Sequence, residues 1–117
     1  MMNPEKLILE TPYGTRDLLP RDAAEMRHME NMLSSLFRSW GYDEVVTPTI
    51  EHLETLAPRV QEENSLFMLL GNQNKILALR NEMTTPIARL VSSRLKDAPV
   101  PLKLSYIGNV FRVEQTQ

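Results

Sequence analysis

The sequence contains no cysteine. The chain therefore forms no disulfide, and it offers no thiolate for nucleophilic catalysis or for metal binding. The two histidines, His28 and His52, have no partner at metal-ligand spacing, so we expect both to be solvated. A glycine-rich phosphate loop and a nucleophile motif are also absent from the sequence. We therefore expect the chain to use no metal and no cofactor.

Strong charge of one sign and long apolar runs are missing too. With 13 basic and 15 acidic residues the formal net charge is −2, whereas nucleic-acid-binding domains usually carry a basic excess. We therefore expect no strong nucleic-acid binding from this segment. No apolar run approaches the ~20 residues that cross a bilayer, and residues 1–10 do not resemble a signal peptide. These absences predict a cytoplasmic protein without a membrane segment.

The composition that remains is that of a single globular domain. The chain has 117 residues, of which 42% are hydrophobic and 24% are charged, and both fractions are typical of globular proteins. Because domains commonly contain about 100–150 residues, we do not expect a second independent core.

A long amphipathic helix is the clearest local pattern. Asp22, with Glu25 three residues later, is typical of a capping box at a helix start, and Gly41 suits the position just after a helix end. Between them, apolar residues recur every three or four positions, which places them on one face that we expect to pack in the core. These residues are Met26, Met29, Leu33, Phe37 and Trp40.

The other predicted elements alternate between strands and helices. They are an ordered loop at 11–20, a strand at 42–46 stopped by Pro48, a helix within 50–56, a loop at 57–64, a β-hairpin formed by 65–70 and 75–80, a helix from 84–86 onward, and a long strand at 102–113. In the second helix, Thr85 is the expected cap and Pro86 the expected first residue. This order predicts an α+β fold with a mostly antiparallel sheet and helices on one face.

One candidate site lies in residues 79–86, where a predicted strand gives way to a helix N-terminus. Free backbone N–H groups and a partial positive charge collect at such a point. Glu82 could bind an amine there, and Thr84 a hydroxyl or carboxylate. The alternative is simple helix capping by Thr84 or Thr85, with Glu82 on the surface.

A second candidate site lies in the last predicted strand. Alternation places Arg112 and Glu114 on one face, with Phe111 and Val113 on the other. An arginine on a sheet can hold a phosphate or carboxylate through two parallel hydrogen bonds, and a neighbouring glutamate can accept from an amino group. The alternative is an exposed ion pair worth less than about 1 kcal/mol.

Taken in order, four segments resemble the histidyl-tRNA synthetases and their paralogues. Residues 13–20 (YGTRDLLP) resemble the opening signature, and 41–48 (GYDEVVTP) are similar to class II motif 1. Residues 79–84 (LRNEMT) resemble the amino-acid-binding segment, and 106–114 (YIGNVFRVE) are similar to the first strand of motif 2. The resemblance implies a partial class II aminoacyl-tRNA synthetase-like antiparallel sheet with flanking helices.

The family implies a role for each matching residue. Arg112 matches the arginine that contacts the ATP α-phosphate and the substrate carboxylate, and Glu114 matches the acidic residue near the adenine. Glu82 and Thr84 match the residues that hold the α-amino group of histidine. Pro48 matches the proline at the dimer interface. We therefore expect Arg112 and Glu82 to face one shared cavity.

Individual residues within these motifs favour one branch of the family. Met83 stands where the synthetases typically have glycine, and residues 108–112 resemble the regulatory-subunit branch, which has lost aminoacylation and partners the short form of ATP phosphoribosyltransferase in histidine biosynthesis. The resemblance thus implies no catalytic residue, a homodimer formed through motif 1, and histidine as a ligand. Two alternatives stay open: a catalytic synthetase that activates histidine with ATP, and a dimerisation module without a ligand.

The chain also departs from the family pattern. Asn81 replaces the usual proline, residues 115–117 replace a proline-containing pattern, and the sequence stops within motif 2. We therefore expect residues 1–117 to be the N-terminal part of a class II synthetase-like catalytic domain. Such a fragment should expose an apolar strand edge unless it self-associates, and should be inactive alone.

Overall fold

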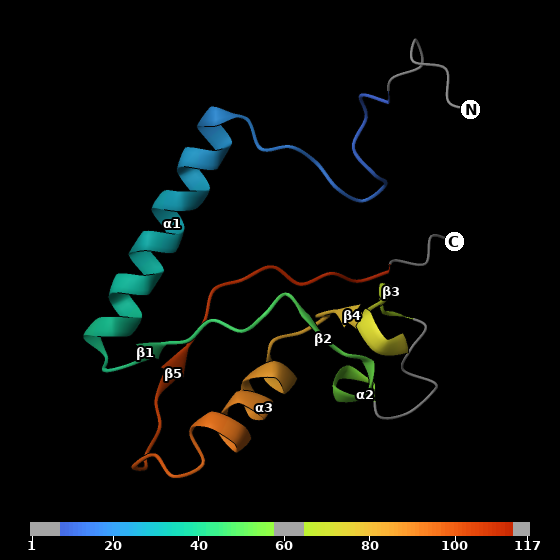
Figure 1. Cartoon of the computed structure of the whole chain (residues 1–117). Helices are drawn as coiled ribbons and strands as arrows, with labels where there is room; N and C mark the ends of the chain where they lie inside the picture. The colour runs from blue at the N-terminus through green and yellow to red at the C-terminus, as the bar shows by residue number, and fades with distance from the viewer. Residues whose placement is uncertain (1–7, 58–64, 114–117) are drawn as a thin grey trace.

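The computed structural model describes residues 8–57 and 65–113, and within them it contains helices and short strands in an α+β arrangement (Figure 1). The predicted fold class is confirmed. In chain order the elements are α1 (Pro20–Ser39), β1 (Asp43–Glu44), β2 (Ile50–His52), α2 (Leu53–Leu56), β3 (Met68–Leu70), the 3-10 turn η2 (Asn72–Asn74), β4 (Ile76–Leu79), α3 (Thr84–Arg94) and β5 (Leu104–Ser105).

The strands form two small sheets. An antiparallel sheet has the order β2-β4-β3, with Glu51 opposite Ala78 and Leu69 opposite Leu77. This confirms the predicted hairpin, whose turn residues Gln73 and Asn74 have positive φ angles of 60° and 58°. The other sheet pairs β1 with β5 in parallel. This parallel pair was absent from the predicted, mostly antiparallel sheet, because it joins segments that are distant in sequence.

Helix α1 is present as predicted, but it begins earlier. Pro20 is its first residue, where the missing N–H costs no hydrogen bond. Leu19 occupies the N-cap position and makes no side-chain cap. The prediction of a capping box at Asp22 is therefore wrong. Asp22 lies inside the first turn, where a carboxylate interacts favourably with the helix dipole.

The predicted end of α1 at Gly41 is confirmed. Gly41 has φ +83°, its N–H donates to the carbonyl of Arg38, and the N–H of Tyr42 donates to the carbonyl of Phe37. These two bonds form a Schellman motif. The rings of Phe37 and Tyr42 lie 6.3 Å apart, which supplies the apolar contact that accompanies this motif. The motif turns the chain from α1 into β1.

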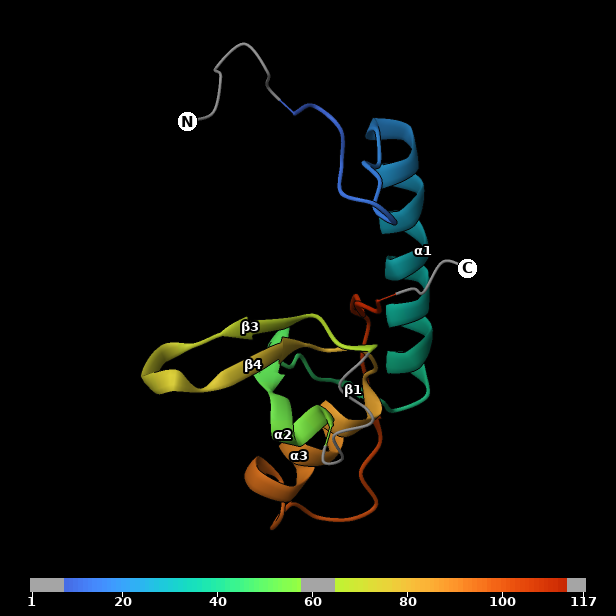
Figure 2. The same ribbon diagram turned by 90° about the vertical axis from the view of Figure 1, so that its right-hand side faces the viewer.

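The prediction that the apolar face of α1 packs in the core is wrong for this chain. No residue of α1 is buried, and Met29 and Trp40 are 57% and 70% exposed. Figures 1 and 2 show the helix standing beside the sheets rather than across them. The core lies instead where the β2-β4-β3 sheet meets α2. It consists of Leu53, Leu56, Ala57, Leu66 and Ala78.

Two further predicted elements are shorter than expected. Within 50–56 the structure has strand β2 and one helical turn, because the backbone of residues 50–52 pairs with β4, and such tertiary pairing overrides local propensity. Within 102–113 only Leu104–Ser105 forms a strand. The rest is held by single hydrogen bonds, such as that from the N–H of Phe111 to the carbonyl of Arg80. Of the predicted 57–64 loop, only Ala57 lies within the described residues.

The apolar strand edge expected of the chain is visible in the hairpin. β3 is an outer strand of its sheet, and Met68 and Leu70 on it are 51% and 74% exposed. Figure 2 shows the β3–β4 hairpin extending away from α2 and α3. Within the described residues, no helix combines the length and the apolar character that a membrane-spanning segment needs.

Candidate ligand site at the start of helix α3

The junction between β4 and α3 is organised by the carboxylate of Glu82. Both of its oxygens accept from the backbone N–H of Thr85, each at 3.1 Å. Met83 occupies the N-cap position, and no hydroxyl caps the helix. The prediction that Thr85 caps α3 is therefore wrong. Pro86 is buried, but it is the third helical residue rather than the first.

This arrangement keeps Glu82 at the positive end of the helix dipole. A carboxylate there is stabilised by the free N–H groups and the dipole of the first turn. Each carboxylate oxygen has two acceptor positions, so the bonds to Thr85 leave Glu82 with acceptor capacity for an amine. Thr84, the first residue of α3, is exposed beside it.

Arg112 reaches the same junction from the C-terminal segment. Its Nε–H donates to the backbone carbonyl of Asn81 at 2.9 Å, a contact between residues 31 apart in sequence. Asn81 directly precedes Glu82, so this bond places the Nε atom of Arg112 beside the residue next to Glu82. Among the described residues, the two terminal nitrogens of Arg112 make no hydrogen bond or ion pair. Glu114, the fourth predicted site residue, lies outside the described residues.

Arg80 is a central residue of this region that sequence reasoning did not single out. Its side chain is buried, with the residue only 7% exposed, and its Nε–H donates to the carbonyl of Asn109 at 2.6 Å. Its Nη1 donates to the carbonyls of Thr47 and Pro48 at 3.0 and 3.4 Å. Strand alternation would have indicated this burial, because Arg80 follows the fully buried Ala78 by two positions.

Pro48, the predicted dimer-interface residue, is exposed, and its carbonyl is one of the acceptors for Arg80. The Pro48 side chain is therefore accessible, whereas its backbone carbonyl is hydrogen-bonded to the buried Arg80 side chain. The predicted role of Pro48 in dimer formation stays a prediction.

Helix α3 is fastened to the antiparallel sheet by an ion pair. Nε of Arg89 lies 2.5 Å from Oε1 of Glu51 on β2, and the Glu51 side chain is 4% exposed. This contact helps to hold α3 against β2, and Glu82 lies just before the start of that helix.

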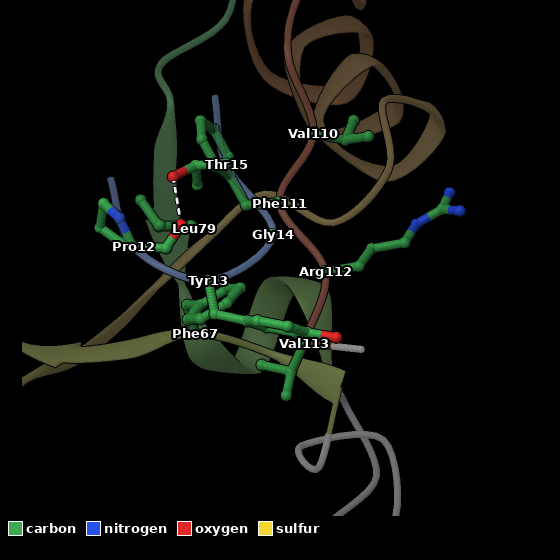
Figure 3. Close-up of a pocket in the computed structure, with 10 residues that line it drawn as sticks. All are labelled: Pro12, Tyr13, Gly14, Thr15, Phe67, Leu79, Val110, Phe111, Arg112 and Val113. Carbon is green, nitrogen blue, oxygen red and sulfur yellow. Dashed lines mark hydrogen bonds between the residues drawn. The ribbon is translucent and has the colours of Figure 1, made fainter. Parts of the chain in front are cut away.

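A cavity of about 650 Å³ opens on the other side of the C-terminal segment (Figure 3). Its walls are mostly apolar, and they come from the N-terminal loop, the hairpin and the C-terminal segment. Figure 3 shows the Arg112 side chain pointing away from this cavity. The lining residues are Pro12, Tyr13, Gly14, Thr15, Phe67, Leu79, Val110, Phe111, Arg112 and Val113.

Glu82 and Thr84 do not line this cavity. The cavity shared by Arg112 and Glu82 stays a prediction, and the contact between them runs through the backbone of Asn81. Among residues 8–57 and 65–113, no three histidine, aspartate or glutamate side chains lie together in a way that could hold a metal ion.

The α+β fold is that of the class II histidyl-tRNA synthetase-like proteins. A sequence model of the histidyl-tRNA synthetase family matches residues 14–117, and the chain belongs to this family. The solved structure of an ATP phosphoribosyltransferase regulatory subunit/histidyl-tRNA synthetase from Bacillus halodurans superposes with a TM-score of 0.81 at 41% identity, covering 93% of this chain and 29% of that one. Apo histidyl-tRNA synthetase from S. aureus superposes with a TM-score of 0.78 at 29% identity, covering 90% of this chain and 30% of that one.

Curated relatives point to one branch of the family. The ATP phosphoribosyltransferase regulatory subunit of Moorella thermoacetica is 47% identical over 113 residues, which cover 95% of this chain and 29% of that protein. Further curated relatives at 39–47% identity carry the same name. The chain thus spans less than a third of the length of these relatives.

Proposed function

We propose that this chain is the N-terminal part of the class II synthetase-like domain of an ATP phosphoribosyltransferase regulatory subunit. The full protein would bind histidine and activate the short-form catalytic subunit in histidine biosynthesis, without catalysing aminoacylation itself. The names of relatives at 39–47% identity support this branch. We place the protein in the cytoplasm and, by its resemblance to motif 1, in a homodimer that contacts its partner near Pro48.

The observation that carries histidine binding is the bond from Arg112 to the carbonyl of Asn81. This bond holds the Arg112 guanidinium beside Asn81, the residue that precedes Glu82. Both terminal nitrogens of the guanidinium make no hydrogen bond to the described residues. A free amino acid presents a carboxylate and an ammonium group a few ångströms apart. In the proposal the carboxylate binds Arg112 through two parallel hydrogen bonds, and the ammonium group binds Glu82 and Thr84.

An ATP-like ligand is the second candidate for binding by Arg112. A guanidinium is equally suited to a phosphate, and the family resemblance would place Glu114 near an adenine. We propose Glu114 for this role on the resemblance alone.

The first test is calorimetry of histidine binding by the protein in its full natural length. We expect binding that weakens about tenfold or more in Arg112→Lys, because lysine cannot form the two-pronged contact and loses the Nε bond to Asn81. Arg94→Lys, on the exposed end of α3, is the matched control and should bind as the wild type does. Histidine binding that is unchanged in Arg112→Lys would remove Arg112 from the site.

The second test addresses the partner. Co-expression with a short-form ATP phosphoribosyltransferase catalytic subunit should yield a complex with phosphoribosyltransferase activity that histidine inhibits. If no complex forms, the regulatory-subunit assignment is wrong.

The competing function is that of a histidyl-tRNA synthetase, which the likeness to the S. aureus enzyme supports. Histidine-dependent exchange between ATP and pyrophosphate separates the two. A synthetase performs this exchange, whereas we expect none from a regulatory subunit. A dimerisation module without a ligand, the remaining alternative, would show neither exchange nor histidine binding.

A further inference from the structure

Arg80 carries a charge that is buried among backbone carbonyls. A buried guanidinium is costly unless its donors are satisfied. Here the acceptors are the carbonyls of Asn109, Thr47 and Pro48. The ion pairs within the described part of the chain do not include Arg80. Its position is therefore set by the main chain around it, and it constrains that main chain in return.

The backbone of Arg80 joins the same two segments as its side chain. Its N–H donates to the carbonyl of Thr49 at 3.0 Å, and its carbonyl accepts from the N–H of Phe111 at 2.8 Å. One residue thus ties the segment around Pro48 to the segment that carries Arg112. Figure 1 shows both segments running beside the end of β4.

The space for this guanidinium depends on Gly108. A Cβ atom at residue 108 would lie 2.8 Å from Nη2 of Arg80, closer than side-chain carbons approach other atoms. Its φ angle is outside the left-handed region, so an alanine would meet no backbone strain. A side chain at position 108 would therefore force the Arg80 guanidinium to shift, so Gly108→Ala tests the Arg80 arrangement from the C-terminal segment.

We propose that Arg80 is a positioning residue for the ligand site: it sets the segment bearing Arg112 against the junction bearing Glu82 and fixes both relative to the Pro48 segment. The part of this inference that concerns ligand affinity rests on the proposed function. Arg112 directly follows the 109–111 main chain, so a shift of that main chain strains the Nε bond to Asn81 that places the guanidinium near Glu82. The affinity for an amino acid should then fall although Arg112 and Glu82 are both intact.

The experiment compares Arg80→Lys, Arg80→Gln and Gly108→Ala in the protein in its full natural length. Arg21→Gln, which removes an arginine of α1 whose side chain is 90% exposed, is the matched surface control. Leu66→Ala, a core truncation beside the sheet, is the control for destabilisation alone. Two quantities are measured: the hydrogen-exchange rate of the Phe111 amide, and the dissociation constant for histidine below the unfolding temperature of every variant.

We expect Arg80→Gln and Gly108→Ala to accelerate exchange at Phe111 by about tenfold and to weaken histidine binding by about tenfold. For Arg80→Lys, both the exchange rate at Phe111 and the affinity for histidine should lie between those of the other two variants and the wild type. The reason is that an ammonium group cannot reach the carbonyls of Thr47 and Asn109 together. Leu66→Ala should lower the unfolding temperature without changing the affinity for histidine.

Unchanged exchange at Phe111 in both Arg80→Gln and Gly108→Ala would overturn the inference, whatever the ligand. Faster exchange with an unchanged affinity would also overturn it, because Arg80 would then be structural only. If the wild type binds no histidine, the proposed function fails, and the exchange rates still decide whether Arg80 positions the 109–111 segment.

Discussion

Arg89 on α3 and Glu51 on β2 form an ion pair between residues 38 apart in sequence, with Nε and Oε1 2.5 Å from each other. The carboxylate is almost fully buried, whereas the guanidinium side chain keeps 36% of its exposure. The ion pair is therefore asymmetric in burial. The sheet contributes the desolvated carboxylate of Glu51, and the helix contributes the partly exposed guanidinium of Arg89 that neutralises it. This ion pair is one of the contacts that hold α3, and with it the junction that carries Glu82, against the sheet.

We expect Arg89→Ala to lower the free energy of unfolding by about 2 kcal/mol, because it leaves the Glu51 carboxylate buried without a counter-charge. The value is set below that for a fully buried pair, since Arg89 is partly screened by solvent. Arg94→Ala, an exposed arginine on the same helix, should cost less than about 0.5 kcal/mol. Urea unfolding measures both, and equal effects would show that Glu51 is satisfied without Arg89.

The small core predicts a steep dependence on single leucines. Leu66 is 4% exposed within the cluster between the sheet and α2. Truncation to alanine should cost about 2–4 kcal/mol, from lost burial and the cavity that remains. Leu70→Ala, on the nearby strand β3 but 74% exposed, is the matched control and should cost less than about 0.5 kcal/mol. A small effect of Leu66→Ala would mean that the core lies elsewhere.

The cap of α3 gives a prediction that separates Glu82 from the threonines. Glu82→Ala should destabilise the protein by about 1 kcal/mol, because it removes the acceptor for the Thr85 N–H and a favourable charge at the helix dipole. Thr85→Ala should be nearly neutral, since Thr85 contributes its backbone N–H to this bond and not its hydroxyl. Thermal unfolding of both variants measures the difference. A larger loss of stability in Thr85→Ala than in Glu82→Ala would contradict the prediction.

Local patterns predicted the elements whose partners are close in sequence. The hairpin was predicted because its turn chemistry and both strands lie within residues 65–80, and the Schellman end of α1 was predicted from Gly41. Arg80 was missed because its acceptors, at 47–48 and 109, are about thirty residues away in either direction. No local pattern specifies such a contact, although the alternation that buries Ala78 indicated which face Arg80 occupies.

The exposure of the apolar face of α1 shows a different limit. A stripe of apolar residues predicts that a helix face will be covered, but it does not say by which chain. Leu33 and Met29 are exposed within this chain. The amphipathic helix was predicted correctly, whereas the prediction that the described part of the chain covers its apolar face was wrong. The site residues Arg112 and Glu82 were predicted from the family resemblance. The structure adds the contact between their segments, through the backbone of Asn81.

The end of α1 provides a test of backbone conformation alone. Gly41 has φ +83°, and no atom of residues 8–57 or 65–113 lies within 4 Å of the position that a Cβ would take. Gly41→Ala should therefore cost about 1 kcal/mol through strain and not through a clash. Gly41→Asn should recover part of the loss, because asparagine tolerates the left-handed region better than alanine. If both variants unfold at the wild-type temperature, the Schellman turn does not limit stability.

The uncovered face of α1 leads to a prediction about self-association. Met29 and Leu33 are 57% and 47% exposed, and apolar stripes of this kind on a folded protein commonly mark a contact surface. We expect Leu33→Glu to weaken association of the protein with itself by about tenfold, measured by sedimentation velocity over a concentration series. Its effect on the unfolding free energy of the monomer should stay below about 0.5 kcal/mol, because the side chain is already exposed. Arg38→Gln, which replaces an exposed arginine in the last turn of the same helix, should change neither quantity. If Leu33→Glu instead unfolds the monomer while association of the remaining folded fraction is unchanged, α1 packs against its own chain.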